Sequence, residues 1–425
     1  MTYRDRARGC LLGLAAGDAL GAPAENLTPA QIAARWGRLT EITGGGTDDT
    51  EYALFAASLL VRHGHALTSA DVAQAYRTLV LPSLEGPMKG AGFSELGTVE
   101  ALRRGLEPPL TGAVHLHGWS DGLAMRAAPY GVFCPGDPAE AARLAEEDGR
   151  VSHAGEGILG GRAVAAGVAV AMTGAPPAAV AAAALAAIPA DSWTARNLVR
   201  VCDLLGVDLP SEPPAQSGRS TVSSPSQAGR SAVSSPSPAG HSAASSSSAS
   251  CLPASDAAPS PNPVAAVPPT LVSPPPSPSA SPAAGGPAPA GAGAAGGGTA
   301  EPGATGTAGD ARLVEALHDA VVVRHYPWTD LAPEAVALAF AAYLAGDGDV
   351  ERAVTFGVSL GRDADTIGAI AGALAGAGQG EGGVPARWAE RIGPVAGKSL
   401  RVVAGRHVLG VADELASAAE AAGAS

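Results

Sequence analysis

The sequence predicts an all-α protein, and two observations support this fold class. Alanine-rich stretches carry apolar residues at helical spacing and are separated by glycines, and no stretch alternates polar and apolar residues as a strand would. Helical patterns of this kind cover nine segments: Leu54–His63, Ser69–Leu79, Pro138–Glu147, Gly157–Met172, Ala178–Ala187, Ala311–Val323, Pro333–Leu344, Val350–Leu360 and Asp365–Ala377.

Composition divides the 425-residue chain into three parts. Residues 211–310 are mostly Ser, Pro, Ala and Gly, and they contain no Phe, Tyr, Trp, Ile or Lys. Such a segment buries too little apolar surface to offset the entropy lost on ordering, so we expect a disordered insertion there. The flanks, residues 1–210 and 311–425, share the same helical texture, and we expect them to be two parts of a single compact multi-helix domain.

Two glycine stripes support that expectation. Glycine recurs at every fourth position in both flanks, at Gly9, Gly13, Gly17 and Gly21 and again at Gly368, Gly372 and Gly376. Each glycine costs a helix about 0.8–1 kcal/mol relative to alanine, so the stripes need a compensating benefit. Close approach of two helix backbones supplies one. Asp18 and Asp365 accompany the stripes, so we predict a buried pair of helices in a soluble core rather than a membrane dimer.

Charge and cysteine usage exclude some classes of function. The net charge is −13, which argues against a general nucleic-acid binder and against docking to an anionic membrane. The run after the N-terminal arginines imitates a signal peptide, but Asp18 interrupts it, and no segment is long and apolar enough to span a bilayer. Cys10, Cys134, Cys202 and Cys251 lie far apart, which fits a reducing compartment and a cytoplasmic location.

The most informative motif is Thr47-Asp48-Asp49-Thr50-Glu51, which follows three glycines and opens an apolar helix. The simplest interpretation is helix capping, with Thr47 or Asp48 as the N-cap and Glu51 closing a capping box. Capping explains one carboxylate and not two. Adjacent aspartates repel each other unless a cation or solvent lies between them.

A second acidic motif, Asp363-Ala364-Asp365-Thr366, also opens a helix. The two motifs together offer four carboxylates and two or three hydroxyls, all of them oxygen donors. Oxygen donors suit Mg²⁺, Mn²⁺ or Ca²⁺ rather than zinc. Four carboxylates favour two ions about 3.5–4 Å apart over a single ion. The spacing therefore predicts a divalent-cation site.

Other candidates are weaker. His115 and His117 lack a third ligand nearby and read as loop residues, and Ser152-His153 has no acid in a recognisable triad order. Arg126 follows the glycine-bearing segment 118–122. It could meet a phosphate or pair with an internal acid, and the sequence favours neither.

These landmarks, in this order, resemble the ADP-ribosylglycohydrolase family, of the dinitrogenase-reductase-activating-glycohydrolase type. The resemblance covers nearly all of residues 5–210 and 311–380. It is carried by five segments: Arg8–Glu25, Thr47–Glu51, Asp121–Pro129, Ser152-His153 with the helix after it, and Asp363–Ala377.

The resemblance implies an all-α fold with two Mg²⁺ or Mn²⁺ ions at its centre. It implies hydrolysis of the bond between the ribose of ADP-ribose and a modified protein side chain or small group. The implied metal ligands are Thr47, Asp48, Asp49, Asp363, Asp365 and Thr366. Glu25, Asp49 and Asp365 would be catalytic. The implied substrate contacts are Gly118, Ser120, Asp121 and Gly122 against the diphosphate and His153 near the substrate.

The chain departs from the family pattern in three places. The central loop usually reads Gly-Asn-Gly, whereas Ser120-Asp121-Gly122 stand here, and Arg362 replaces a common glycine. The acid that some members carry before that loop has only Glu85 and Glu95 as near candidates. Two alternatives therefore stay open: a catalytically silent relative that binds ADP-ribose or keeps the fold, and a binuclear hydrolase of another nucleotide-like substrate.

Overall fold

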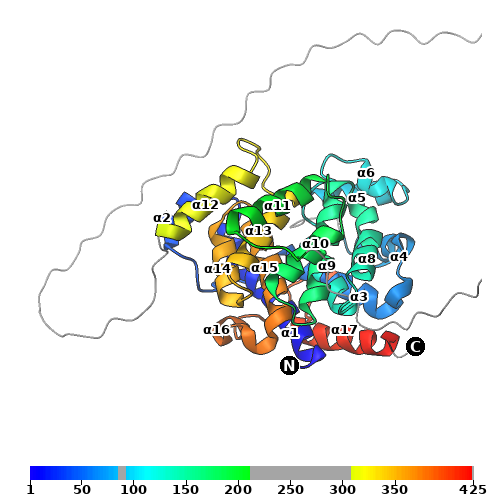
Figure 1. Ribbon diagram of the computed structural model, residues 1–425. Helices are drawn as coiled ribbons and strands as arrows, with labels where there is room; N and C mark the ends of the chain where they lie inside the picture. The colour runs from blue at the N-terminus through cyan, green and yellow to red at the C-terminus, as the bar shows by residue number, and fades with distance from the viewer. Residues whose placement is uncertain (85–91, 211–307, 424–425) are drawn as a thin grey trace, which may run out of the picture. The chain divides into compact units, whose positions relative to one another are not determined.

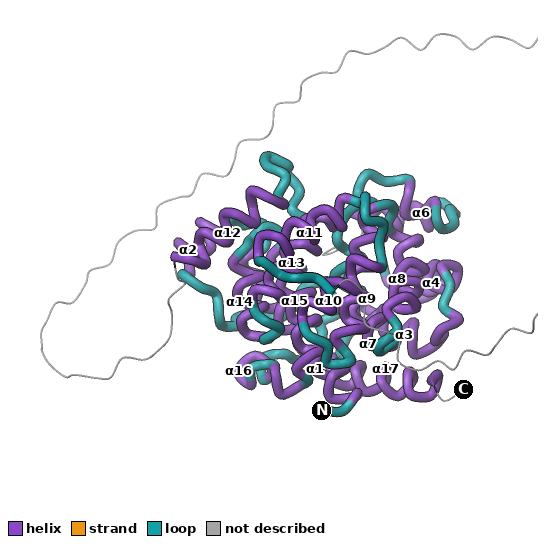
Figure 2. The backbone as a smooth tube through the Cα atoms, in the orientation of Figure 1, coloured by secondary structure: helices purple, strands orange, loops and turns teal. Residues whose placement is uncertain are grey.

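The computed structural model describes residues 1–84, 92–210 and 308–423. Within these ranges the chain forms helices joined by loops, and it contains no strand (Figure 2). The one β-type contact there is an isolated bridge between Ser120 and Leu331. The predicted all-α class is confirmed for the described part of the chain.

The helices follow one another along the chain as shown in Figure 1. Their bounds are α1 Tyr3–Gly21, η1 Ala22–Ala24, α2 Pro29–Trp36, α3 Asp48–His63, η2 Gly64–Ala66, α4 Ser69–Ala75, η3 Tyr76–Val80, η4 Leu81–Ser83, α5 Phe93–Arg103, α6 Leu110–Ala113, α7 Ala128–Phe133, α8 Pro138–Ser152, α9 Glu156–Ala171, α10 Pro177–Ala186, α11 Trp193–Leu205, α12 Ala308–Val321, α13 Ala332–Ala345, α14 Val350–Ser359, α15 Ala364–Gln379, η5 Glu381–Gly383, α16 Ala386–Ala389, η6 Arg401–Val403 and α17 Val408–Gly423.

All nine predicted helices are present, with differences at their ends. Residues 211–307 of the expected insertion lie outside the described residues. Its last three residues belong to α12, which begins at Ala308, three residues before the predicted start at Ala311. Asp310 in the first turn suits the positive end of that helix. α8 runs on to Ser152 instead of ending at Glu147, because Asp148 pairs with Arg126 inside the protein.

The two glycine stripes meet, as the sequence predicts. α1 packs along α15, and a Cβ atom built on Gly13 would lie 2.2 Å from the carbonyl oxygen of Gly372. One built on Gly17 would lie 2.0 Å from the carbonyl oxygen of Gly368. Only glycine allows these backbones to approach so closely. The contact joins the N-terminal flank of the chain to the C-terminal flank.

The same contact positions the ends of both helices. The missing side chain of Gly21 leaves room for the backbone of Asp365, whose Cα would otherwise lie 2.4 Å from a Cβ atom. The end of α1 and the start of α15 therefore lie against each other. Among the described residues, no helix is both long enough and apolar enough to cross a membrane.

Candidate active site

The start of α3, the start of α15 and the loop after η1 converge on a cavity of about 610 Å³. The described residues that line it include eight carboxyl side chains: Glu25, Asp48, Asp49, Glu95, Asp121, Asp330, Asp363 and Asp365. Its described lining offers one side-chain cation, Lys398. The cavity is therefore strongly acidic, and it contains both motifs that the sequence singled out.

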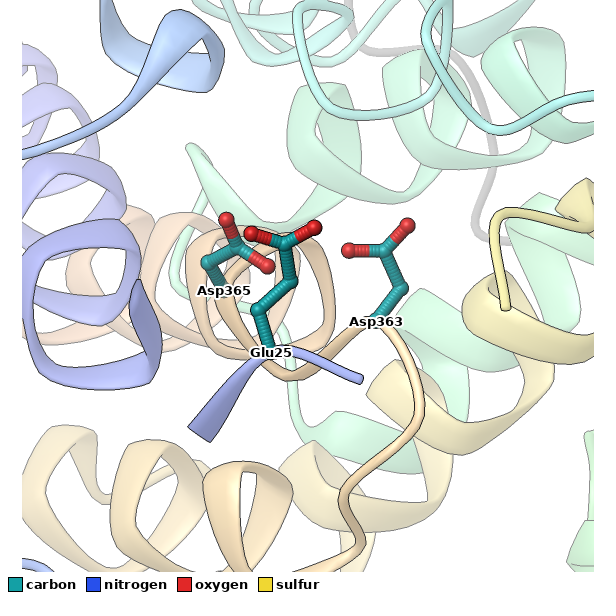
Figure 3. A group of neighbouring side chains, drawn as sticks. All are labelled: Glu25, Asp363 and Asp365. Atoms are coloured by element: carbon teal, nitrogen blue, oxygen red, sulfur yellow. The ribbon is translucent and has the colours of Figure 1, made fainter. Parts of the chain in front are cut away.

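Three of these acids form a tight group. One carboxylate oxygen each of Glu25, Asp363 and Asp365 lies within 4.8 Å of the other two. Figure 3 shows their carboxylates extending to the same side of the segments that carry them. Glu25 is exposed, whereas Asp365 is buried. The group thus spans the mouth and the floor of the cavity.

Backbone pairing explains why Glu25 lies beside the later motif. The amide of Asn26 donates to the carbonyl of Arg362 at 2.8 Å, and the amide of Arg362 donates to the carbonyl of Leu27 at 3.0 Å. Arg362 has a φ of 61°, a conformation that favours glycine. Its Nε donates to Glu334 at 2.6 Å, and this contact helps to hold the strained backbone of the non-glycine residue.

The first acidic motif lines the same cavity. Thr47 is the N-cap of α3, and its hydroxyl accepts from the amide of Asp49 at 3.4 Å. The hydroxyl of Thr366 donates to Asp49 Oδ2 at 3.0 Å, which links the two motifs directly. Thr47, Asp48, Asp49, Asp363, Asp365 and Thr366 therefore surround one space, although they come from segments more than 300 residues apart.

Asp18 holds the start of α3 in this arrangement, a role that the sequence did not predict. It is fully buried in α1, and it accepts from the amide of Thr47 at 2.8 Å and from the amide of Thr50 at 3.1 Å. The hydroxyl of Thr50 donates to it as well. An aspartate in the middle of a buried glycine stripe was the available signal.

The predicted capping box is wrong in one respect. Glu51 does not return to the N-cap of its own helix. Its carboxylate accepts from the backbone amides of Lys398, Ser399 and Leu400 at 2.8–2.9 Å. Buried Glu51 thereby fastens a C-terminal segment to α3 and brings Lys398 to the edge of the cavity.

The electrostatics of the cavity favour a bound cation. Burial is the main reason that the pKa values of Asp48, Asp49, Asp363 and Asp365 are raised well above the ordinary range, and neighbouring carboxylates raise them further. Buried Asp365 Oδ1 has no hydrogen-bond partner among the described residues. A buried acceptor without a partner is costly, and a cation at this point would satisfy it.

The central loop contributes part of the wall. Ser120, Asp121 and Gly122 line the cavity, whereas Gly118 and His153 do not. His153 is buried behind Ser120, with its Nε2 atom 3.1 Å from the serine Oγ. Burial, aided by the charge of Asp330, raises the pKa of Asp121 well above its usual value.

The two alternatives for Arg126 are resolved by its contacts. Its guanidinium is buried and donates to Asp148 at 2.8 Å and to Glu95 at 2.9 Å, so it pairs with internal acids and does not line the cavity. Glu95 does face the cavity. The other near candidate for an acid before the central loop, Glu85, lies outside the described residues.

Several lining residues carried no sequence signal. Phe93 and Trp328 stand at the rim, both partly exposed, and the ring of His117 contacts each of them. Asp330 joins the wall because its carbonyl accepts from the amide of Asp121 at 3.0 Å. Only the folded chain brings the segment before α13 to this place.

The family model described as ADP-ribosylglycohydrolase matches residues 1–257 and 291–424. The chain belongs to the ADP-ribosylglycohydrolase family.

Two individual relatives match a smaller part of the chain than the family model does. An ADP-ribosyl-[dinitrogen reductase] glycohydrolase of Rhodospirillum rubrum is 33% identical over 162 residues, 36% of this chain and 52% of the relative. An uncharacterized protein of Archaeoglobus fulgidus is 32% identical over 178 residues, 39% of this chain and 55% of the relative. The chain thus spans about half the length of the curated relatives it matches.

One solved structure supports the fold. A chain of an ADP-ribosylglycohydrolase-related protein complex superposes with a TM-score of 0.52 at 22% identity, covering 98% of this chain and 99% of the other. At this level of identity the likeness shows a shared fold.

Proposed function

We propose that this chain is a metal-dependent hydrolase that cleaves the glycosidic bond between ADP-ribose and a modified protein side chain or small group. The observation that carries the proposal is the grouping of Glu25, Asp363 and Asp365, with ligand oxygens within 4.8 Å, beside the first acidic motif. Family membership supports ADP-ribosyl hydrolysis as the reaction class. The Rhodospirillum rubrum relative is a glycohydrolase of ADP-ribosylated dinitrogen reductase by name, which supports a protein as the carrier of the ADP-ribose.

The donor set fits two hard divalent cations. The six residues that would hold two Mg²⁺ or Mn²⁺ ions offer only carboxylate and hydroxyl oxygens: Thr47, Asp48, Asp49, Asp363, Asp365 and Thr366. Asp365 Oδ1, which has no hydrogen-bond partner in the described part of the chain, supports the same proposal. When bound, such ions supply Lewis-acid stabilisation and orient the ribose hydroxyls and a water.

The chain's own residues supply the remaining chemistry. Glu25 is the exposed member of the group, and its Oε1 already accepts from the Asn26 side chain at 2.9 Å. We assign its carboxylate the role of taking a proton from the attacking water. Asp49, held by Thr366, and Asp365 fix the reacting groups on the cavity floor.

The cavity suits a ligand of nucleotide size. Its volume of about 610 Å³ lies within the range of roughly 300–1,000 Å³ found for small-molecule sites. The identity of the modified group, the choice of metal and the cytoplasmic location stay predictions.

A turnover assay with defined substrates tests the proposal. Purified full-length protein would be incubated with arginine-, serine- and nucleobase-linked ADP-ribose, with EDTA or with added Mg²⁺ or Mn²⁺. We expect hydrolysis of at least one substrate, lost with EDTA and restored by metal. Asp203→Asn, at an exposed position on α11, is a matched control that should retain full activity.

Calorimetry separates the alternatives. A silent relative would bind ADP-ribose without turning over any substrate. A hydrolase of another nucleotide-like substrate would bind Mg²⁺ or Mn²⁺ but show no affinity for ADP-ribose. Either result would replace the proposed function.

A further inference from the structure

Six buried side chains in and behind the cavity wall form a closed ring of hydrogen bonds, and none of them belongs to the proposed metal ligands. The contacts are Arg126 Nη2 to Ser152 Oγ 2.6 Å, Ser152 Oγ to His153 Nδ1 2.7 Å, His153 Nε2 to Ser120 Oγ 3.1 Å, Ser120 Oγ to Ser94 Oγ 3.0 Å, Ser94 Oγ to Glu95 Oε2 2.5 Å, and Arg126 Nη1 to Glu95 Oε1 2.9 Å. Ser94, Glu95 and Ser120 are the members that line the cavity.

Counting hydrogens fixes the direction of this ring. Arg126 can only donate and the Glu95 carboxylate can only accept. If His153 carries its proton on Nε2, each of the six contacts receives one hydrogen, and every donor arrow runs from Arg126 towards Glu95. If the proton is on Nδ1, Ser120 must donate to the imidazole. The single hydroxyl hydrogen of Ser94 then has to serve its contacts with both Ser120 and Glu95. One of these two short oxygen–oxygen contacts is left without a hydrogen.

We propose that His153 is a positioning residue whose neutral, Nε2-protonated imidazole sets this direction, so that Ser94, Ser120 and Glu95 present only hydrogen-bond acceptors to the cavity. Both serine hydrogens point along the ring, which leaves each hydroxyl a lone pair for a ligand. The structure places His153 behind the wall, so it acts through Ser120 rather than on the substrate.

The backbone of the central loop also withholds two donors from the cavity. The amide of Ser120 donates to the carbonyl of His117 at 3.1 Å, and the amide of Asp121 donates to Asp330 at 3.0 Å. Both amides are therefore already used within the protein. A diphosphate has only acceptors, so the side chains of this wall, which offer it no hydrogen, do not favour it. This wall suits the group that leaves the ribose, which carries hydrogen-bond donors. We therefore assign the leaving group, and not the diphosphate, to this side of the cavity, and this assignment rests on the proposed function.

Two further features fit the ring. A Cβ atom on Gly122 would lie 2.7 Å from Glu95 Oε1 and 3.2 Å from His153 Nε2, so glycine is needed for the ring to close. Burial, with the nearby charge of Arg126, lowers the pKa of His153 well below its usual value, which keeps the imidazole neutral.

Nitrogen NMR tests the direction of the ring without any substrate. Full-length protein labelled with ¹⁵N-histidine would be compared with His153→Gln at pH 7, and the signals lost in the variant belong to His153. We expect a neutral ring with its proton on Nε2. A proton on Nδ1, or a charged ring, would overturn the proposal.

Kinetics test what the wall recognises. His153→Gln keeps an N–H donor towards Ser120, whereas His153→Leu and Ser120→Ala break the ring. For the two variants that break the ring we expect kcat/KM to fall about tenfold or more, because one charge-assisted contact with the leaving group is lost. The Kd for free ADP-ribose should change less than about twofold. His153→Gln should recover most of the loss.

The outcomes are distinguishable. An equal weakening of ADP-ribose binding would place the diphosphate on this wall and refute the assignment. Equal losses in His153→Gln and His153→Leu would indicate a purely structural histidine. Absence of turnover in the wild type would count against the proposed function, whereas the NMR result would still decide the direction of the ring.

Discussion

The contact between the glycine stripes can be tested by one methyl group. In Gly372→Ala the new Cβ atom would lie 2.1 Å from the carbonyl oxygen of Gly13, roughly 1.4 Å closer than an ordinary contact of about 3.5 Å. Both partners are backbone atoms in helices, so no rotamer change relieves the clash. α1 and α15 must move apart.

The magnitude follows from two opposing effects. Overpacking of a close-packed core costs about 1–3 kcal/mol, and a backbone clash belongs at the upper end. Alanine returns about 1 kcal/mol of helix propensity. We expect a net loss of about 2 kcal/mol in the free energy of unfolding. The matched control is Gly378→Ala on the same helix, where a Cβ atom meets nothing within 4 Å and alanine should stabilise by up to about 1 kcal/mol.

Circular dichroism at 222 nm would follow thermal unfolding of both variants. The difference of about 3 kcal/mol between them corresponds to roughly 6–12 °C in Tm. Gly372→Ala should also bind Mn²⁺ more weakly, because α15 carries Asp365 and Thr366 at its start. Equal Tm values for the two variants would refute the argument that close backbone approach requires these glycines.

The remaining predictions concern the cavity and the insertion. Asp48→Asn and Asp365→Asn should each abolish turnover while leaving the helical CD spectrum intact; full activity in either variant would contradict the site assignment. The carboxyls of Asp48, Asp49 and Asp365 have raised pKa values in the folded chain, so the stability they contribute without metal is present below their ordinary pKa and is lost as pH rises through the folded-state pKa. Thermal scans in EDTA should therefore give a lower Tm at pH 8 than at pH 5.5, and Mn²⁺ should raise the Tm more at pH 8; a metal-free Tm that increases over this range would show that other groups dominate. Replacing residues 212–300 with a short Gly/Ser linker should leave folding and turnover nearly unchanged, and loss of both would refute the interpretation of this segment as an insertion into one domain.

The sequence predicted the helices and the stripe contact because both depend on local pattern. Apolar spacing marks a helix wherever it lies, and a repeated glycine has a cost that only close packing offsets. The end of α8 was missed for the opposite reason. The predicted helix ended at Glu147, but Asp148 pairs with buried Arg126 and Gly149 makes room for Leu123, so α8 continues to Ser152.

The site residues also divide into those marked by a local sequence pattern and those that reach the site through distant contacts. The paired acids of the two motifs were visible because adjacent carboxylates at helix starts need an explanation. Asp330 and Lys398 were not, since each reaches the cavity through contacts with residues far away in the chain, and Glu95 was only one of two near candidates for the acid before the central loop. The ring that holds His153 was equally invisible, because it joins serines from three separate segments.

Packing and chemistry depend on each other at the junction of α1 and α15. Carboxylates gathered in a buried cavity repel one another and raise each other's pKa, so without a cation the site opposes folding. The glycine stripes supply an opposing contribution, because their contact runs along α1 from Gly9 to Gly21. It ends four residues before Glu25 on the first flank and beside Asp365, in the first turn of α15, on the second. A chain that packed these helices less closely would relieve the repulsion by letting the acids separate. The close backbone contact is therefore what keeps the acids together in the absence of metal, and metal affinity should weaken with every substitution that widens it.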